Sequence, residues 1–147
     1  KTTCHAGEWC HHPAKGVDYL RDRYQLLKNI CTAIFDLKAD RIGHAIPLAY
    51  ADDLMKAVKE RNIAIEGCPG SNLSSGLIPN TKYLKIRRLL AKGINYSLNP
   101  DDDLFMPNLS EVFQICNAEY NFTEEERQKL LLNPWLAKFG SRKKHRF

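Results

Sequence analysis

Four short segments with the composition of β-strands alternate with longer helical segments along this chain of 147 residues. The predicted strands span residues 1–5, 41–46, 62–68 and 94–98. Alternation of strand and helix is typical of right-handed βαβ units, which build a parallel sheet. A closed barrel of eight such units needs about 250 residues. The chain is therefore predicted to be an α/β protein, either a small open sheet with outer helices or half of a barrel.

The helices are predicted from periodicity and from capping residues. Apolar residues recur every three or four positions over residues 17–34, as on one face of an amphipathic helix. Three further helices are predicted near 52–61, over 81–93 and from 108 to 120. A capping box at Thr123–Glu126 predicts a helix that ends near Leu132. A separate short helix is predicted to begin at Asn133–Pro134 and to end at Gly140.

The composition excludes several classes of protein. Hydrophobic residues make up 44% and charged residues 27% of the chain, as in soluble globular proteins. No stretch approaches the ~18 consecutive apolar residues that a membrane span needs. The net charge is +5, and four positive charges lie in the last six residues. We therefore expect one nearly neutral domain over residues 1–140 and a basic tail over 141–147, which gives no support to a nucleic-acid-binding face.

The cysteines and the first residues bear on cellular context. There are five cysteines, an odd number, and no CxxC pair occurs. This usage predicts reduced thiols in a cytoplasmic protein. The chain does not begin with Met, and its first residues read like the middle of a strand. It is therefore predicted to be part of a longer protein.

Each predicted strand ends at ionisable or metal-binding side chains. These are His5 and Glu8 after the first strand, His44 in the second, Glu66 and Cys68 in the third, and Asp101, Asp102 and Asp103 after the fourth. In parallel α/β folds, functional groups gather at the carboxyl ends of the strands. Gly7 permits a turn that brings Glu8 back beside His5. Imidazole and carboxylate are the ligands of a catalytic zinc, and a further acid and imidazole can transfer protons. Any one of these residues alone could be a solvated loop group or a buried core histidine, but together they predict a site.

These strand ends belong to four segments: His5-Ala-Gly-Glu8, Arg41-Ile-Gly-His44, Glu66-Gly-Cys-Pro-Gly-Ser-Asn72 and Ser97-Leu-Asn-Pro-Asp-Asp102. In order and spacing they resemble four successive motifs of the adenosine deaminase family. The resemblance implies the C-terminal half, strands five to eight, of a TIM (β/α)8 barrel. It also implies a zinc-dependent hydrolase that converts an aminopurine, with adenosine favoured, to inosine and ammonia. Adenine and AMP are the alternative substrates.

The resemblance also implies the roles of single residues. His5 matches a zinc-ligand histidine, and Asp101 matches an aspartate that binds both the zinc and the attacking water. Glu8 matches the acid that donates a proton to purine N1. His44 matches the histidine that orients and deprotonates the water.

Substrate contacts and support are implied in the same way. Asp102 matches the aspartate that holds purine N7, and Gly7 the glycine whose backbone approaches the ring. Glu66 is expected to support His44 from behind. Ala45 stands where the family usually has glycine.

One part of the family's zinc site is absent from this sequence. The family's first strand carries a His-x-His pair, and no such pair occurs in the chain. We therefore expect an N-terminal half barrel, covalently linked or separate, to complete a site that holds one zinc. Without it, the inner face of the sheet is expected to be apolar and to expose Ile42 and Ile65. The rival hypothesis is a non-catalytic half barrel that binds a partner.

Overall fold

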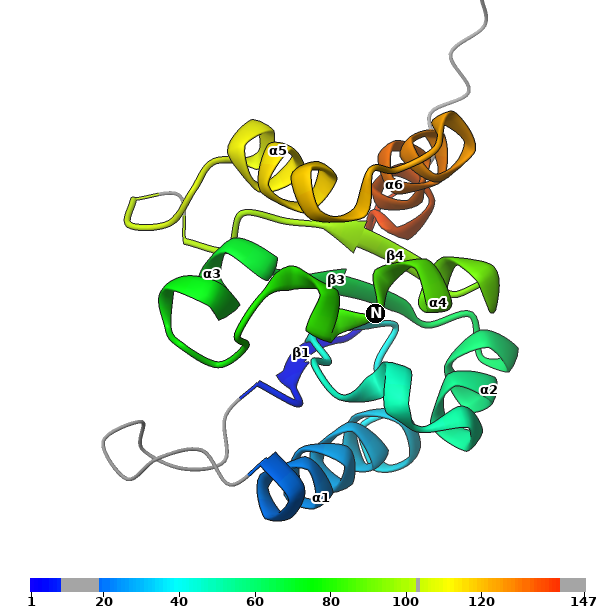
Figure 1. Cartoon of the computed structure of the whole chain (residues 1–147). Coiled ribbons are helices and arrows are strands. Elements are labelled where there is room, and N and C mark those ends of the chain that lie inside the picture. The colour runs from blue at the N-terminus through cyan, green and yellow to red at the C-terminus, as the bar shows by residue number, and fades with distance from the viewer. Residues whose placement is uncertain (9–18, 103, 141–147) are drawn as a thin grey trace, which may run out of the picture.

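The computed structural model describes residues 1–8, 19–102 and 104–140. Its four strands form one sheet in the order β1-β2-β3-β4, and every neighbouring pair is parallel (Figure 1). The strands are β1 (Thr3–Ala6), β2 (Arg41–His44), β3 (Ala64–Gly67) and β4 (Asn95–Leu98). The predicted α/β fold with a parallel sheet is confirmed.

All four strands are shorter than predicted, two of them because the backbone becomes left-handed at or beside their ends. His44 and Ala45 have φ 65° and 47°, and β2 therefore ends at His44 rather than at residue 46. Asn62 has φ 54°, and β3 begins only at Ala64. A left-handed residue cannot continue the extended ladder of a parallel sheet.

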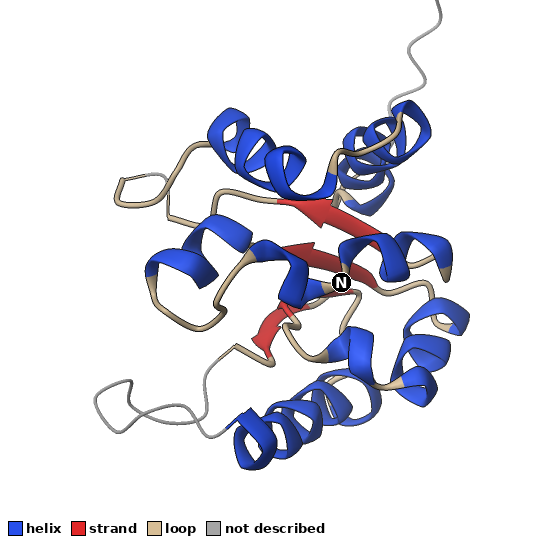
Figure 2. Ribbon diagram, viewed as in Figure 1, coloured by secondary structure: helices blue, strands red, loops and turns tan. Residues whose placement is uncertain are grey.

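The helices follow the strands in the predicted alternation (Figure 2). They are α1 (Tyr19–Cys31), α2 (Asp52–Glu60), α3 (Pro69–Ser74), α4 (Ile86–Ala91), α5 (Leu109–Tyr120) and α6 (Glu124–Ala137). A π-helical turn at Thr32–Asp36 extends α1, and 3₁₀ turns lie at Leu48–Tyr50 and Thr81–Leu84. In Figure 1, α1 lies toward the β1 side of the sheet, and α5 and α6 lie toward the β4 side.

Three helical predictions differ from the structure. The helix expected over 81–93 is divided at Lys85, whose φ of 51° is left-handed and separates a 3₁₀ turn from α4. The six-residue α3 was not predicted, because it is too short to show a helical period. The two helices expected after residue 123 form the single helix α6, which contains Pro134.

Asn133 explains why α6 continues. Its side chain does not cap a new helix; Nδ2 instead donates to the Tyr96 carbonyl oxygen of β4 at 2.7 Å. This hydrogen bond connects the C-terminal part of α6 to strand β4. Pro134 has no backbone N–H to donate within α6, and the helix ends three residues later, at Ala137.

The predicted capping box at Thr123 is confirmed, and the structure shows a second one at Asn108, where a helix was predicted to start. Asn108 and Thr123 each accept a hydrogen bond from the backbone three residues on. Glu111 and Glu126 return a bond to the capping residue's own N–H, which completes a capping box at each helix.

One face of the sheet packs on the helices, and the other is polar. Ile42, Ile65 and Tyr96 are at most 1% exposed and belong to the hydrophobic core. Side chains alternate along a strand, so the residues between them point the other way. We call this second surface the open face; it carries Thr3, His5, Arg41 and Glu66. The expectation that Ile42 and Ile65 would be exposed on an apolar inner face is therefore wrong.

Two other expectations concern membrane-spanning helices and the basic tail. Among the described residues, the structure has no helix with the length and apolar character of a membrane span. The basic tail, residues 141–147, lies outside the described residues.

Candidate functional site

The carboxyl ends of the strands bring together most of the predicted site residues. His5 lies in β1 and Glu8 just beyond it, His44 ends β2, and Asp101 follows β4. We call these four residues the strand-end cluster. Their ligand atoms fall into two groups, His5 with Glu8 and His44, and His44 with Asp101 and Cys68, each within 4.8 Å. His44 therefore stands at the centre of the cluster.

His44 is buried between a neutral and an acidic environment. Its side chain is fully covered, and Nδ1 lies 3.0 Å from Oδ1 of Asn72. Nε2 lies on the other side of the ring, 3.2 Å from Glu8 Oε2 and 3.9 Å from Asp101 Oδ2. Despite the short distance to Glu8, Nε2 has no hydrogen bond of good geometry among the described residues. It is a buried nitrogen directed at the two carboxylates.

His5 is more exposed and packs against its neighbours through its ring. Nδ1 lies 3.9 Å from Glu8 Oε2, and the ring meets His44 edge-on with the centroids 4.8 Å apart. The ring covers Gly43, where an added Cβ would lie only 2.7 Å from His5 Cδ2. Gly43 therefore leaves room for the His5 imidazole, which explains a glycine beside His44 in this motif.

The backbone around the cluster is left-handed at four positions. Gly7 has φ 76°, as expected of the glycine that turns the chain after β1. His44, Ala45 and Asp101 also have φ between 47° and 79°. Three of the seven described non-glycine residues with positive φ thus lie at this site. Strained backbone of this kind concentrates at functional sites.

Asp102, predicted to contact the substrate, lies outside the cluster. Asp102 is exposed, and its Oδ1 accepts a hydrogen bond from the backbone N–H of Leu104 at 3.0 Å. Asp102 therefore caps the turn that follows β4, and its second carboxylate oxygen is left for other contacts. Asp103 lies outside the described residues.

Glu66 does not have the position that was expected of it. It lies on the open face, where Oε1 is 3.5 Å from Arg41 Nε and Oε2 accepts from Thr3 Oγ1 at 3.4 Å. Asn72, the last residue of the same motif, contacts His44 instead. The alternation of side chains along β3 directs Glu66 away from the helix-covered side, and α3 brings Asn72 back beneath the ring.

Cys68 lies next to the cluster as a buried thiol. It is 5% exposed, and its Sγ donates to the Glu66 carbonyl oxygen at 3.5 Å. Burial, followed by the nearby charges of Asp101 and Glu8, raises the pKa of Cys68 to about 12. Cys68 is thus a neutral side chain at physiological pH, as expected of a small buried hydrophobe.

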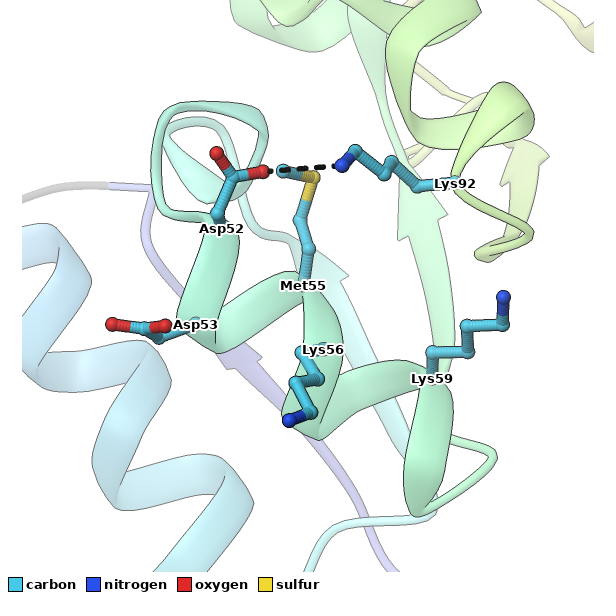
Figure 3. A pocket seen from close by; sticks show the side chains of 6 residues that line it. All are labelled: Asp52, Asp53, Met55, Lys56, Lys59 and Lys92. Atoms are coloured by element: carbon cyan, nitrogen blue, oxygen red, sulfur yellow. Dashed lines mark ion pairs between the residues drawn. The ribbon is translucent and has the colours of Figure 1, made fainter.

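A separate hollow of about 330 Å³ lies between α2 and Lys92 (Figure 3). Among its charged lining residues, Asp52 and Lys92 pair with each other. Asp52 Oδ1 lies 3.6 Å from Lys92 Nζ and 2.9 Å from an Arg88 nitrogen. The Arg88 hydrogen bond holds the pKa of Asp52 below its usual range. The hollow contains none of the strand-end residues.

Comparison with known proteins identifies related sequences. The family model described as adenosine deaminase matches residues 24–146. Adenosine deaminase from Plasmodium vivax is 37% identical over 113 residues, which are 74% of this chain and 30% of that protein. Adenosine deaminase from Clostridium botulinum is 29% identical over 150 aligned positions, covering 92% of this chain and 45% of that protein. The chain thus spans less than half the length of these relatives.

A solved structure shares the fold. Adenine deaminase from Arthrobacter aurescens superimposes with a TM-score of 0.75 at 23% identity. The match covers 95% of this chain and 38% of that one. The arrangement of strands and helices described above therefore recurs inside a larger protein.

Proposed function

The chain belongs to the adenosine deaminase family, and we propose that it carries the acid, the base and two metal ligands of a purine deaminase. The proposed reaction is the hydrolytic deamination of adenosine to inosine and ammonia. The observation that carries this proposal is the position of His44 Nε2, 3.2 Å from Glu8 and 3.9 Å from Asp101. A buried base that faces two carboxylates suits a reaction in which water loses a proton and the substrate gains one.

The donor set fits a zinc ion in its chemistry, and its two members belong to the two groups that share His44. Imidazole nitrogen and carboxylate oxygen are its usual ligands, and in the proposal His5 and Asp101 supply one of each. Buried and without a hydrogen bond among the described residues, His44 Nε2 is free to contact a water held beside such an ion. Zinc, when bound, supplies acidity by lowering the pKa of a water molecule to about 7.

The remaining steps are those of the chain's own side chains. His44 accepts the proton of the attacking water at Nε2 and holds that water in line with purine C6. Glu8 donates a proton to purine N1, so that C6 becomes open to attack. Gly7 lets the ring approach the backbone, and the free carboxyl oxygen of Asp102 faces N7, a contact that requires a proton between the two acceptor atoms. His44 then gives its proton to the amino nitrogen, the C6–N bond breaks and ammonia leaves. The C6 hydroxyl gives its remaining proton to Glu8, which leaves the C6 carbonyl of inosine and restores both side chains.

We further propose that this chain forms the C-terminal half of a TIM barrel and that an N-terminal half completes it. Strands β1 and β4 each have one strand neighbour among the described residues. Helix α6 leaves four large apolar side chains at least half exposed, Leu131, Leu132, Trp135 and Leu136. Unpaired edges and an exposed apolar surface of this kind suit the addition of further strands and helices. The added half would bring the missing His-x-His ligands.

A cytoplasmic location forms part of the same proposal. The described cysteines Cys4, Cys31, Cys68 and Cys116 are all free thiols. Free thiols persist in the reducing cytosol.

The test measures ammonia release from adenosine, adenine and AMP by the full-length protein that contains this chain, together with its zinc content. We expect activity on adenosine, about one zinc per site, and a loss of roughly a hundredfold or more in rate for Glu8→Gln. Glu60→Gln is the matched control, because Glu60 is exposed and its ion pair is with Lys56 on the same helix. A folded, metal-free protein that acts on none of the three purines would overturn the proposal and favour a non-catalytic binding module. Unchanged turnover in Glu8→Gln would refute the role of Glu8.

A further inference from the structure

Asn72 is a buried polar residue to which the sequence assigns no role. It is 0% exposed, and its Oδ1 lies 3.0 Å from Nδ1 of the equally buried His44. The two residues are 28 positions apart in sequence and meet beneath the strand-end cluster.

The backbone holds Asn72 in a fixed position. Its N–H donates to the Cys68 carbonyl oxygen at 3.0 Å, which anchors it within α3. Its carbonyl oxygen accepts from the N–H groups of Leu77 and Ile78 at 2.9 and 3.3 Å. The Asn72 side chain is therefore presented to His44 from a support that is bonded on both sides.

The contact has a consequence for the proton on the ring. An amide oxygen can only accept a hydrogen bond, so Nδ1 must carry a proton when it meets Oδ1. Nε2, on the side of Glu8 and Asp101, then keeps its lone pair. If the amide were turned over, Nδ2 would donate to Nδ1 and the single proton of the neutral ring would lie on Nε2.

We propose that Asn72 is a positioning residue that holds the His44 ring in place, with the proton of the neutral ring on Nδ1 and the lone pair of Nε2 directed at Glu8 and Asp101. The role of His44 Nε2 in catalysis rests on the proposed function. The position of the proton on Nδ1 rests only on the contact with Asn72.

A neutral partner suits this position. Glu8 and Asp101 already place two carboxyl groups on the far side of the ring. A carboxylate behind His44 would add a negative charge to a buried region, where a charge costs desolvation free energy. The Asn72 amide fixes the ring and its proton without that charge.

Nuclear magnetic resonance of the full chain with ¹⁵N-labelled histidine tests the proposal, because protonated and unprotonated ring nitrogens have well-separated shifts. The His44 signals are assigned from their loss in His44→Gln. We expect Nδ1 of His44 to be protonated in the wild type and in Asn72→Asp, since a carboxylate also accepts. Asn72→Leu, which has no acceptor, is expected to lose this preference. Ser71→Ala is the matched control, a neighbouring buried residue of α3 without a side-chain contact to His44 in the described structure.

A neutral ring with its proton on Nε2 in the wild type would overturn the proposal, whether or not Asn72→Leu folds. An unchanged Nδ1 proton in a folded Asn72→Leu would overturn it as well. In the active protein, Asn72→Leu is expected to lower kcat about 10- to 100-fold with little change in KM, as for other residues that orient a catalytic group. Nδ1 protonation in a protein without deaminase activity would contradict the proposed function and leave the inference about Asn72 standing.

Discussion

Replacement of Gly7 by alanine is expected to destabilise the chain by about 2–5 kcal/mol, from two terms. The left-handed backbone, φ 76°, disfavours any side chain by roughly 1–2 kcal/mol. The added Cβ would also lie 2.7 Å from Ile30 Cδ1 and 3.2 Å from the Ala45 backbone. Overpacking of this kind costs about 1–3 kcal/mol. Because Gly7 lies between His5 and Glu8, the strain would also disturb the contact between Glu8 and His44.

Gly76 allows the cost of the left-handed backbone to be measured without the cost of overpacking. Gly76 has φ 69° but no atom within 4 Å of its added Cβ, so Gly76→Ala should cost only the backbone term of about 1–2 kcal/mol. Ile30→Val removes Cδ1, the atom nearest to the new methyl group, and alone costs about 0.5–1.5 kcal/mol. In the double variant with Gly7→Ala the two changes should be less than additive by about 1 kcal/mol.

Urea unfolding followed by circular dichroism measures the free energy of unfolding of the wild type and the four variants. The reasoning is refuted if Gly7→Ala costs no more than Gly76→Ala. It is also refuted if the effects of Gly7→Ala and Ile30→Val simply add, because the close contact with Ile30 would then have no energetic weight.

Three further outcomes follow from the contacts described. Arg87→Ala should destabilise the chain by about 1 kcal/mol, because Arg87 donates hydrogen bonds to Glu126 of α6 and to a carbonyl oxygen at the end of α5. The control Arg88→Ala, which breaks a surface ion pair, should change the free energy of unfolding in urea by less than about 0.5 kcal/mol. The Arg87 hydrogen bond lowers the pKa of Glu126, so its stabilisation is complete above the usual glutamate range and is lost as the pH falls through the lowered value; Glu126→Gln should reduce the loss of stability over that acid range in urea titrations. Burial raises the pKa of Cys68 and of Cys116 to about 12, so both should resist iodoacetamide at pH 8 until the chain unfolds, as peptide mass spectrometry would detect.

The alternation of strands and helices could be predicted because it depends on local patterns. The capping box at Thr123 is read directly from residues three apart. The division at Lys85 could not be predicted, because lysine is not a residue that signals a left-handed backbone. The continuity of α6 was missed for another reason: Asn133 finds its partner on β4, 37 residues away in sequence.

The site was predicted as a set of residues but not in its contacts. The rule that functional groups gather at strand ends predicts His5, Glu8, His44 and Asp101 in one place, and the structure has them in two groups that share His44. It does not say which side chain lies behind His44. Glu66 is the more conspicuous choice in the sequence, but strand alternation turns it to the open face. A buried asparagine in a motif that begins at a strand end is the signal that could have pointed to Asn72.

The left-handed residues at His44, Ala45 and Asp101 have a consequence for protein engineering. A screen for thermostable variants favours substitutions that relieve backbone strain, and glycine at such positions is an obvious choice. At Ala45 the change is chemically small, yet this residue directly follows the central histidine. Variants selected for heat resistance would therefore tend to acquire glycines at the carboxyl ends of the strands. The His44 side chain would then be held less rigidly. Stability and turnover should be screened together in this protein, and the three positions should be kept out of any library that selects for stability alone.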